Sequence, residues 1–144
     1  MFIIILKNYF NIIIVMSMIS SYFNELKKYE TMYGEKTILL WQCGSFYEIY
    51  GLKDTKTNEY SGSHIQQYSD ILGAVIAVKN STMKGQHKDK SLVMAGYNTS
   101  VPLEKYVSKL NKEGYTVVVW VEFGDDPISK GKIRKEKGIY SIGT

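Results

Sequence analysis

An aromatic residue and a carboxylate stand two positions apart in this sequence, directly after a pair of turn-forming residues. Phe46 and Glu48 follow Gly44 and Ser45, and the runs on both sides of the turn are rich in residues that favour strands. This pattern is typical of a hairpin. Because alternate residues of a strand share a face, Phe46 and Glu48 should point the same way, roughly 6 to 7 Å apart, with Tyr47 on the opposite face.

Two interpretations of this pair compete. In the first, Phe46 is an aromatic wedge that can enter a stack of planar rings, and Glu48 is a hydrogen-bond acceptor beside it. In the second, Phe46 belongs to the core and Glu48 to the surface, which is the usual arrangement for an arbitrary Phe-x-Glu in a strand. The tripeptide alone is weak evidence for the wedge, and the tight turn before it favours the wedge only together with further matches along the chain.

Carboxylates also allow a metal-dependent nuclease, in which acidic side chains and a lysine would act around a divalent ion. The candidates are Glu48, Asp54, Asp125 and Asp126. Most of these lie in predicted turns, and Gly124 follows Glu122 where a nuclease Glu-x-Lys would carry lysine. The nuclease is therefore kept as an alternative only.

Cysteine and histidine chemistry is sparse in these 144 residues. Cys43 is the single cysteine, and His64 and His87 are well separated, so no disulfide framework or zinc spacing is present. Cys43 is predicted to be a buried small hydrophobe. A composition of 44% hydrophobic and 22% charged residues indicates one globular domain. The net charge of +4 and pI near 9.0 favour an anionic partner without deciding the function.

Hydrophobic periodicity and Gly or Pro punctuation predict helices and strands that alternate around the hairpin. The predicted helices are Ser20 or Ser21 to Tyr33, Ser63 to Leu72, and Leu103 to Glu113; the predicted strands are Ala74–Val78, Leu92–Gly96, Tyr115–Phe123 and Ile139–Ile142. The expected fold class is α+β: a single domain with a mixed sheet that includes a hairpin and is flanked by helices. A Rossmann fold is excluded because no strand is followed by G-x-G-x-x-G.

Two basic stretches could contact phosphates. Lys130, Lys132 and Arg134 lie in a cluster near the C-terminus, although lysines that protect an exposed edge strand would produce the same pattern. The segment from Lys79 to Ser91 is predicted to be a charged loop, and a solvated connection is as good an explanation for it as a phosphate contact.

Residues 1–19 are apolar, with Lys7, Asn8 and Asn11 as interruptions. A signal peptide would have a basic start and a cleavage site of small residues, and neither is clear in this segment. A membrane span would need about twenty apolar residues without polar interruption. We expect instead that translation starts at Met16 or Met18 and that residues 1–19 are an extension outside the fold, which then comprises residues 20–144. A module held at a membrane by this segment is a further alternative.

The segment Gly44-Ser45-Phe46-Tyr47-Glu48-Ile49-Tyr50 resembles the Gly-Asp-Phe-Tyr-Glu signature of the mismatch-recognition domain of MutS-type DNA repair proteins. Further similarities follow in the family's order and extend the resemblance over about Tyr22 to Thr144. They are Met94-Ala95-Gly96, Leu103 to Gly114 with Glu104-Lys105-Tyr106 and Lys109-Leu110, then Gly124-Asp125, Ser129-Lys130-Gly131 and Gly143-Thr144.

The resemblance implies that the chain binds mismatched or damaged double-stranded DNA. It makes Phe46 the residue that stacks on the mispaired base and Glu48 the residue that hydrogen-bonds that base, with Gly44 and Ser45 forming the turn that presents them. A decayed module with only a structural or interaction role remains an alternative.

The chain departs from the family pattern at two places. Ser45 stands where the family has Asp, so the turn carries no charge, and Tyr97 to Pro102 replaces a Pro-Tyr-His-like segment. Backbone contacts that the family makes through that segment are not implied here.

The resemblance also sets expectations for cofactors and partners. The sequence contains no G-x-x-x-x-G-K-[ST] loop, so we expect no enzyme activity and no cofactor in this chain, with ATP and Mg²⁺ confined to C-terminal domains of a MutS-type parent. The expected partners are mismatched duplex DNA, the remaining MutS-type domains and a partner subunit. We expect an intracellular, soluble protein that is not secreted and has no stable membrane association.

Overall fold

The computed structural model describes residues 2–81, 88–128 and 131–142, and it describes the side chains of the first helix from residue 18 onward. The helices are α1 (Phe2–Tyr33), α2 (Ile65–Leu72) and α3 (Leu103–Lys112). The strands are β1 (Thr37–Cys43), β2 (Phe46–Asp54), β3 (Tyr60–Ser61), β4 (Ala77–Asn80), β5 (Lys90–Asn98), β6 (Thr116–Asp125) and β7 (Lys132–Tyr140).

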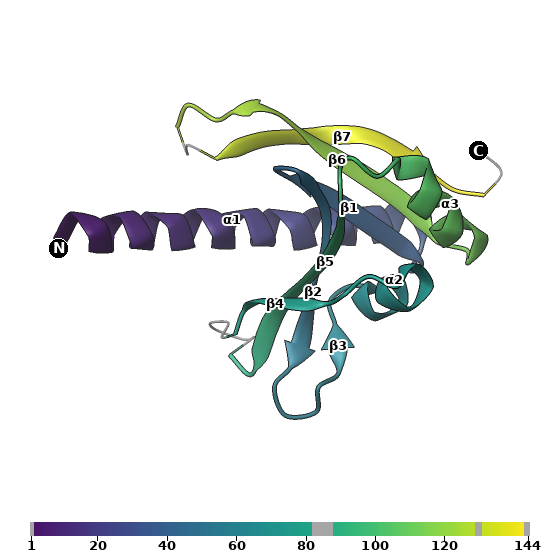
Figure 1. Ribbon diagram of the computed structural model, residues 1–144, viewed down its shortest axis with the longest axis horizontal. Coiled ribbons are helices and arrows are strands. Elements are labelled where there is room, and N and C mark those ends of the chain that lie inside the picture. The colour runs from purple at the N-terminus through teal and green to yellow at the C-terminus, as the bar shows by residue number, and fades with distance from the viewer. Residues whose placement is uncertain (1, 82–87, 129–130, 143–144) are drawn as a thin grey trace.

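The strands form one mixed sheet in the order β4-β5-β2-β1-β6-β7, with β3 paired to β2 (Figure 1). Among the described residues, β1 and β6 are the one parallel pair, and the other neighbouring strands run antiparallel. The parallel pair needs a long crossover, and the chain between β1 and β6 supplies it with β2 to β5, α2 and α3. The predicted fold class, a single α+β domain with a mixed sheet and a hairpin, is confirmed.

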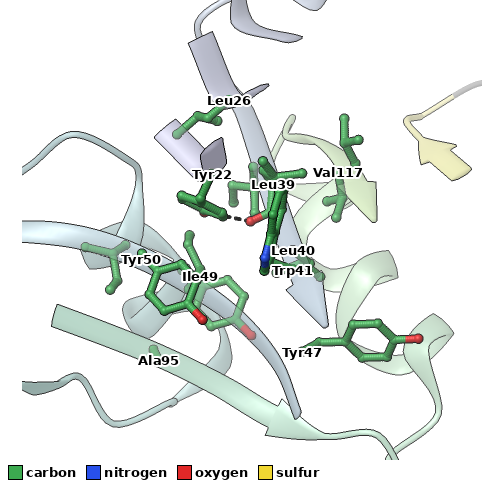
Figure 2. Packing of buried hydrophobic residues seen from close by; sticks show 14 of the residues in the cluster. Tyr22, Leu26, Leu39, Leu40, Trp41, Tyr47, Ile49, Tyr50, Ala95 and Val117 are labelled. Atoms are coloured by element: carbon green, nitrogen blue, oxygen red, sulfur yellow. Dashed lines mark hydrogen bonds between the residues drawn. The ribbon is translucent and has the colours of Figure 1, made fainter. Parts of the chain in front are cut away.

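Helices cover both faces of the sheet. On one face, the Tyr22 ring of α1 lies 4.9 Å from the Tyr50 ring and 5.7 Å from the Trp41 ring, and its hydroxyl donates to the Leu39 carbonyl over 2.7 Å. On the other face, the hydroxyl of Tyr97 donates to the last residue of α2, and its ring stacks on α3. Figure 2 shows Tyr22 beside Tyr50, with the Tyr47 ring pointing away from them. Residues 37–41 of β1 are therefore buried without alternation.

The predicted hairpin is confirmed, with Trp41 paired to Glu48 and Cys43 paired to Phe46. Cys43 itself is half-buried rather than buried, because it ends β1 beside the turn. The strand predicted at Ala74–Val78 corresponds to β4, which begins three residues later, at Ala77. Residues 74–76 belong to the connection from α2. Of the residues 139–142 predicted as a strand, 139 and 140 are the end of the longer strand β7, whereas 141 and 142 follow it outside the sheet.

The first helix is longer than predicted. The predicted start at Ser20 or Ser21 is wrong, because α1 is one continuous helix from Phe2 and no glycine or proline interrupts residues 2–33. Gly34, at φ +103°, ends it as expected. Ile19, the last residue of the predicted extension, is buried in the core. The boundary of the extension stays a prediction. In the described part of the chain, no helix has both the length and the apolar character required to cross a membrane.

Tyr29 joins α1 to β6 and β7 and gives stability a dependence on alkaline pH. Its hydroxyl donates to the Glu136 carboxylate over 2.5 Å and accepts from Trp120 Nε1 over 3.0 Å. Burial, followed by the hydrogen bond to Glu136, raises the pKa of Tyr29 to about 12. The folded state therefore holds this proton more tightly than the unfolded state, whose tyrosine pKa is about 10.

We expect Tyr29→Phe to be less stable than the unaltered chain below pH 10, by about 1 kcal/mol for the lost hydrogen bond. That difference should narrow as pH rises from 10 to 12, because the contribution of Tyr29 is complete below the unfolded pKa and is lost above it. Thermal unfolding of both proteins between pH 8 and pH 12 measures this. A difference that stays constant over that range would contradict the assignment.

Candidate nucleic-acid interface

The turn that carries the predicted site residues is a two-residue connection between β1 and β2. Gly44 has φ +61°, which glycine adopts without the steric cost that a side chain would add. The turn is exposed, and the Ser45 carbonyl accepts from Thr99 N over 2.7 Å, which ties it to the end of β5. The backbone amide of Gly44 donates to the Glu122 carboxylate of β6. The turn is thus held from both sides.

A polar cluster under the turn consists of Gln42, Glu122 and Arg134. Gln42 accepts from Glu122 N over 2.9 Å at its side chain and from Arg134 Nε over 2.8 Å at its carbonyl. The guanidinium of Arg134 lies 4.0 Å from the Glu122 carboxylate and 5.4 Å from the Trp41 ring. Charged groups that are partly buried are stabilised by such pairing, so this cluster fixes the hairpin tip against β6 and β7.

Phe46 is the first residue of β2, and 44% of its surface is exposed. Fully burying a phenylalanine side chain is worth about 1.5–3 kcal/mol relative to leaving it in water, and Phe46 forgoes much of that. Its neighbours in β2 from Tyr47 to Leu52 are all buried, so the exposure is confined to the strand's first position. The ring is available to a partner at the tip of the hairpin.

Glu48 lies on the same strand two residues further into the sheet, and it is 5% exposed. Its carboxylate accepts from the Tyr50 hydroxyl and lies 3.5 Å from the ammonium group of Lys79. Lys79 also lies over the Tyr50 ring, 5.2 Å from the ring centroid. Burial and the hydrogen bond to Glu48 raise the pKa of Tyr50 well above its usual range, which keeps the hydroxyl protonated as a donor.

Gly96 explains how β5 fits beside Glu48. It is the residue of β5 paired with Glu48, and a Cβ at this position would lie 2.3 Å from the Tyr47 carbonyl oxygen. No side chain can be added there without displacing the backbone of β2. The Met94-Ala95-Gly96 segment noted in the sequence therefore has a packing role directly against the site.

The predicted phosphate-contacting residues have different surroundings. Lys130 lies outside the described residues. Lys132 is half exposed and lies 2.6 Å from Asp125, and this hydrogen bond raises the pKa of the ammonium group. The side chain of Arg134 is only 10% exposed and belongs to the cluster under the turn. The edge-strand interpretation agrees with the position of β7 at the end of the sheet; phosphate contact by these residues stays a prediction.

The carboxylates considered for a nuclease are distributed over separate places. Asp54 ends β2 and accepts from the backbone amides of Lys56 and Thr57, which lowers its pKa. Asp125 pairs with Lys132 at the far end of β6. Among the described residues, no group of three or more His, Cys, Asp or Glu side chains has the arrangement of a metal site.

Three site residues were not identified from the sequence: Lys79, Tyr50 and Glu122. Lys79 was assigned to a charged loop, of which residues 82–87 lie outside the described residues, whereas the structure places it in β4. Tyr50 follows Glu48 by two residues, so the period of a strand could have placed their side chains together. Nothing in the sequence pairs Glu122 with a turn 78 residues earlier.

Comparison with known proteins gives one informative similarity. No family model matches the chain. The chain is 28% identical over 123 residues to a DNA mismatch repair protein MutS homologue of Acanthamoeba polyphaga mimivirus. The aligned residues make up 85% of this chain. The chain spans about a tenth of the length of that relative. The similarity is distant, and it indicates a MutS-related region in this chain.

Proposed function

We propose that this chain binds mismatched or damaged double-stranded DNA as the recognition domain of a MutS-type repair protein. In this proposal Phe46 enters the duplex at the mispaired base and Glu48 hydrogen-bonds that base. The similarity to a mismatch repair protein homologue supports the repair context. The observation that carries the proposal is the exposed ring of Phe46 at the hairpin tip, on the same strand as a buried, partnered carboxylate.

Hydrogen bonds hold the tip of the hairpin, which an inserting side chain requires. Base faces are hidden in a duplex, and an aromatic side chain that inserts from the minor groove must unstack a step, at a cost of a few kcal/mol. A mismatch lowers that cost because pairing is already weakened. The Gly44 amide donates a hydrogen bond to Glu122, and the Ser45 carbonyl accepts one from Thr99. These bonds restrict movement of the tip, so the Phe46 ring would keep its position when it enters the base stack.

Glu48 would supply discrimination as a positioned hydrogen-bond acceptor. Lys79 and Tyr50 already compensate one oxygen of its carboxylate. A base displaced by Phe46 can offer a donor to the carboxylate, whereas the bases of an intact stack cannot reach it. The hydrogen bond therefore favours mismatched over matched DNA.

The proposal gives this stretch of sequence a binding role. ATP, Mg²⁺ and their hydrolysis would belong to other domains of a MutS-type parent, together with a partner subunit. Backbone affinity would come from basic residues, with Lys130 and Lys132 as candidates. It would fall as the salt concentration rises, because the release of counterions from the DNA then becomes less favourable. Arg134 would contribute through the cluster under the turn.

Salt-controlled competition binding tests this function. The chain is titrated with a labelled duplex carrying one mismatch, against an unlabelled matched duplex of otherwise identical sequence, at several salt concentrations. We expect tighter binding to the mismatch at every salt concentration, with overall affinity falling as salt rises. Equal affinity for both duplexes, or no binding at low salt, would contradict the proposal for this chain.

A further inference from the structure

Lys79 is the cation that compensates the buried carboxylate of the site. It comes from the edge strand β4, two strands away from Glu48 in the order β4-β5-β2, and its ammonium group lies 3.5 Å from the carboxylate. The side chains of Lys79 and Glu48 are 22% and 7% exposed. An ion pair screened from water to this extent is stronger than a surface pair, and removing one partner leaves a buried charge without compensation.

Lys79 reaches the carboxylate across β5, the strand that lies between β4 and β2. Gly96 is the residue of β5 paired with Glu48, and it adds no side chain beside the carboxylate. The ammonium group of Lys79 also lies 5.2 Å from the centroid of the Tyr50 ring. Cation–π attraction adds to the ion pair in this geometry.

The same arrangement fixes the direction of the carboxylate. Tyr50 donates to the carboxylate oxygen that also faces Lys79, so one oxygen is engaged by both groups. On the β1 side, Glu48 is paired with Trp41, which is buried. These contacts restrict the rotation of the Glu48 carboxylate.

We propose that Lys79 is a positioning residue for discrimination: it holds the Glu48 carboxylate in place and thereby sets how strongly the protein prefers mispaired over matched duplexes. This inference rests on the proposed function, because it concerns the same site. It assigns a role in DNA selection to an edge strand that carries none of the other proposed DNA contacts.

A double-mutant cycle tests the role. Affinities for the mismatched and the matched duplex are measured for the unaltered chain, Lys79→Met, Glu48→Gln and the double variant. We expect Lys79→Met to lower the ratio of mismatch affinity to matched-duplex affinity by about fivefold or more, because residues that form an ion pair are energetically coupled. In the Glu48→Gln background the same change should leave the ratio unaltered, because there is no carboxylate to position.

Two further variants test whether the effect is specific to a cation at position 79. Lys79→Arg keeps a cation within reach and should restore most of the ratio. Lys53→Met removes a lysine that also lies over a tyrosine ring, 5.8 Å from the Tyr60 centroid, and should leave the ratio unchanged. Thermal unfolding of each variant confirms that the compared proteins are folded.

The outcomes distinguish the two proposals. If the unaltered chain does not prefer the mismatch, the proposed function fails and this inference fails with it. If the unaltered chain prefers the mismatch and Lys79→Met retains the full ratio, the inference alone is overturned. Equal loss of the ratio in the Glu48→Gln background would also overturn it, since Lys79 would then act without Glu48.

Discussion

We expect Phe46→Ala to abolish the preference for mismatched DNA. Stacking of a base on an aromatic side chain is worth about 1–3 kcal/mol, so the affinity for a mismatched duplex should fall by about 5-fold to 150-fold. Affinity for the matched duplex should change little, because an intact stack does not admit the ring. Unfolding temperature should also change little, since Phe46 is 44% exposed and contributes little to the core.

Phe123 provides a matched control for that experiment. It is a second exposed phenylalanine, 56% accessible, on β6, and Lys135 lies 4.8 Å from its ring centroid. Phe123→Ala removes the same atoms from a similarly exposed site and should preserve the mismatch preference. The wedge assignment would be refuted by a Phe46→Ala protein that discriminates as well as the unaltered chain, or by an equal loss in both variants.

Gly96→Ala is the substitution that we expect to affect stability most. The added Cβ would lie 2.3 Å from the Tyr47 carbonyl oxygen and 3.2 Å from Glu48 Cα, both backbone atoms of β2 that cannot rotate away. Overpacking of this kind costs roughly 3 kcal/mol, which lowers the unfolding temperature of a domain of this size by roughly 10 °C. Because β5 must move away from β2, the ion pair between Lys79 and Glu48 should also weaken.

Gly124→Ala is the control for backbone effects of alanine in a strand. Gly124 lies in β6, and a Cβ there would meet no atom within 4 Å. The unfolding temperature of the Gly124→Ala variant should equal or slightly exceed that of the unaltered chain, since alanine restricts the unfolded state more than glycine does. Thermal unfolding followed by circular dichroism compares the two variants. Similar stability for both would show that the close approach at Gly96 relaxes without cost.

Local sequence patterns predicted much of the architecture because they depend on neighbours in the chain. The hairpin around Gly44 follows from a glycine that can adopt positive φ between two strand-forming runs, and α2 and α3 follow from apolar residues at helical spacing. The mixed sheet follows from helices that alternate with strands. The start of α1 was missed because serine can cap a helix or lie within one, and composition alone does not decide between them.

That Phe46 and Glu48 share a strand beside a tight turn can be predicted from the residues alone, because strand periodicity is a local property. The groups around them come from other parts of the chain and are brought there by the fold. Lys79 reaches Glu48 from another strand, and Glu122 reaches the Gly44 amide across 78 residues. Such contacts depend on strand order and register, which arise from packing of the whole sheet over its core and are not encoded in any short segment.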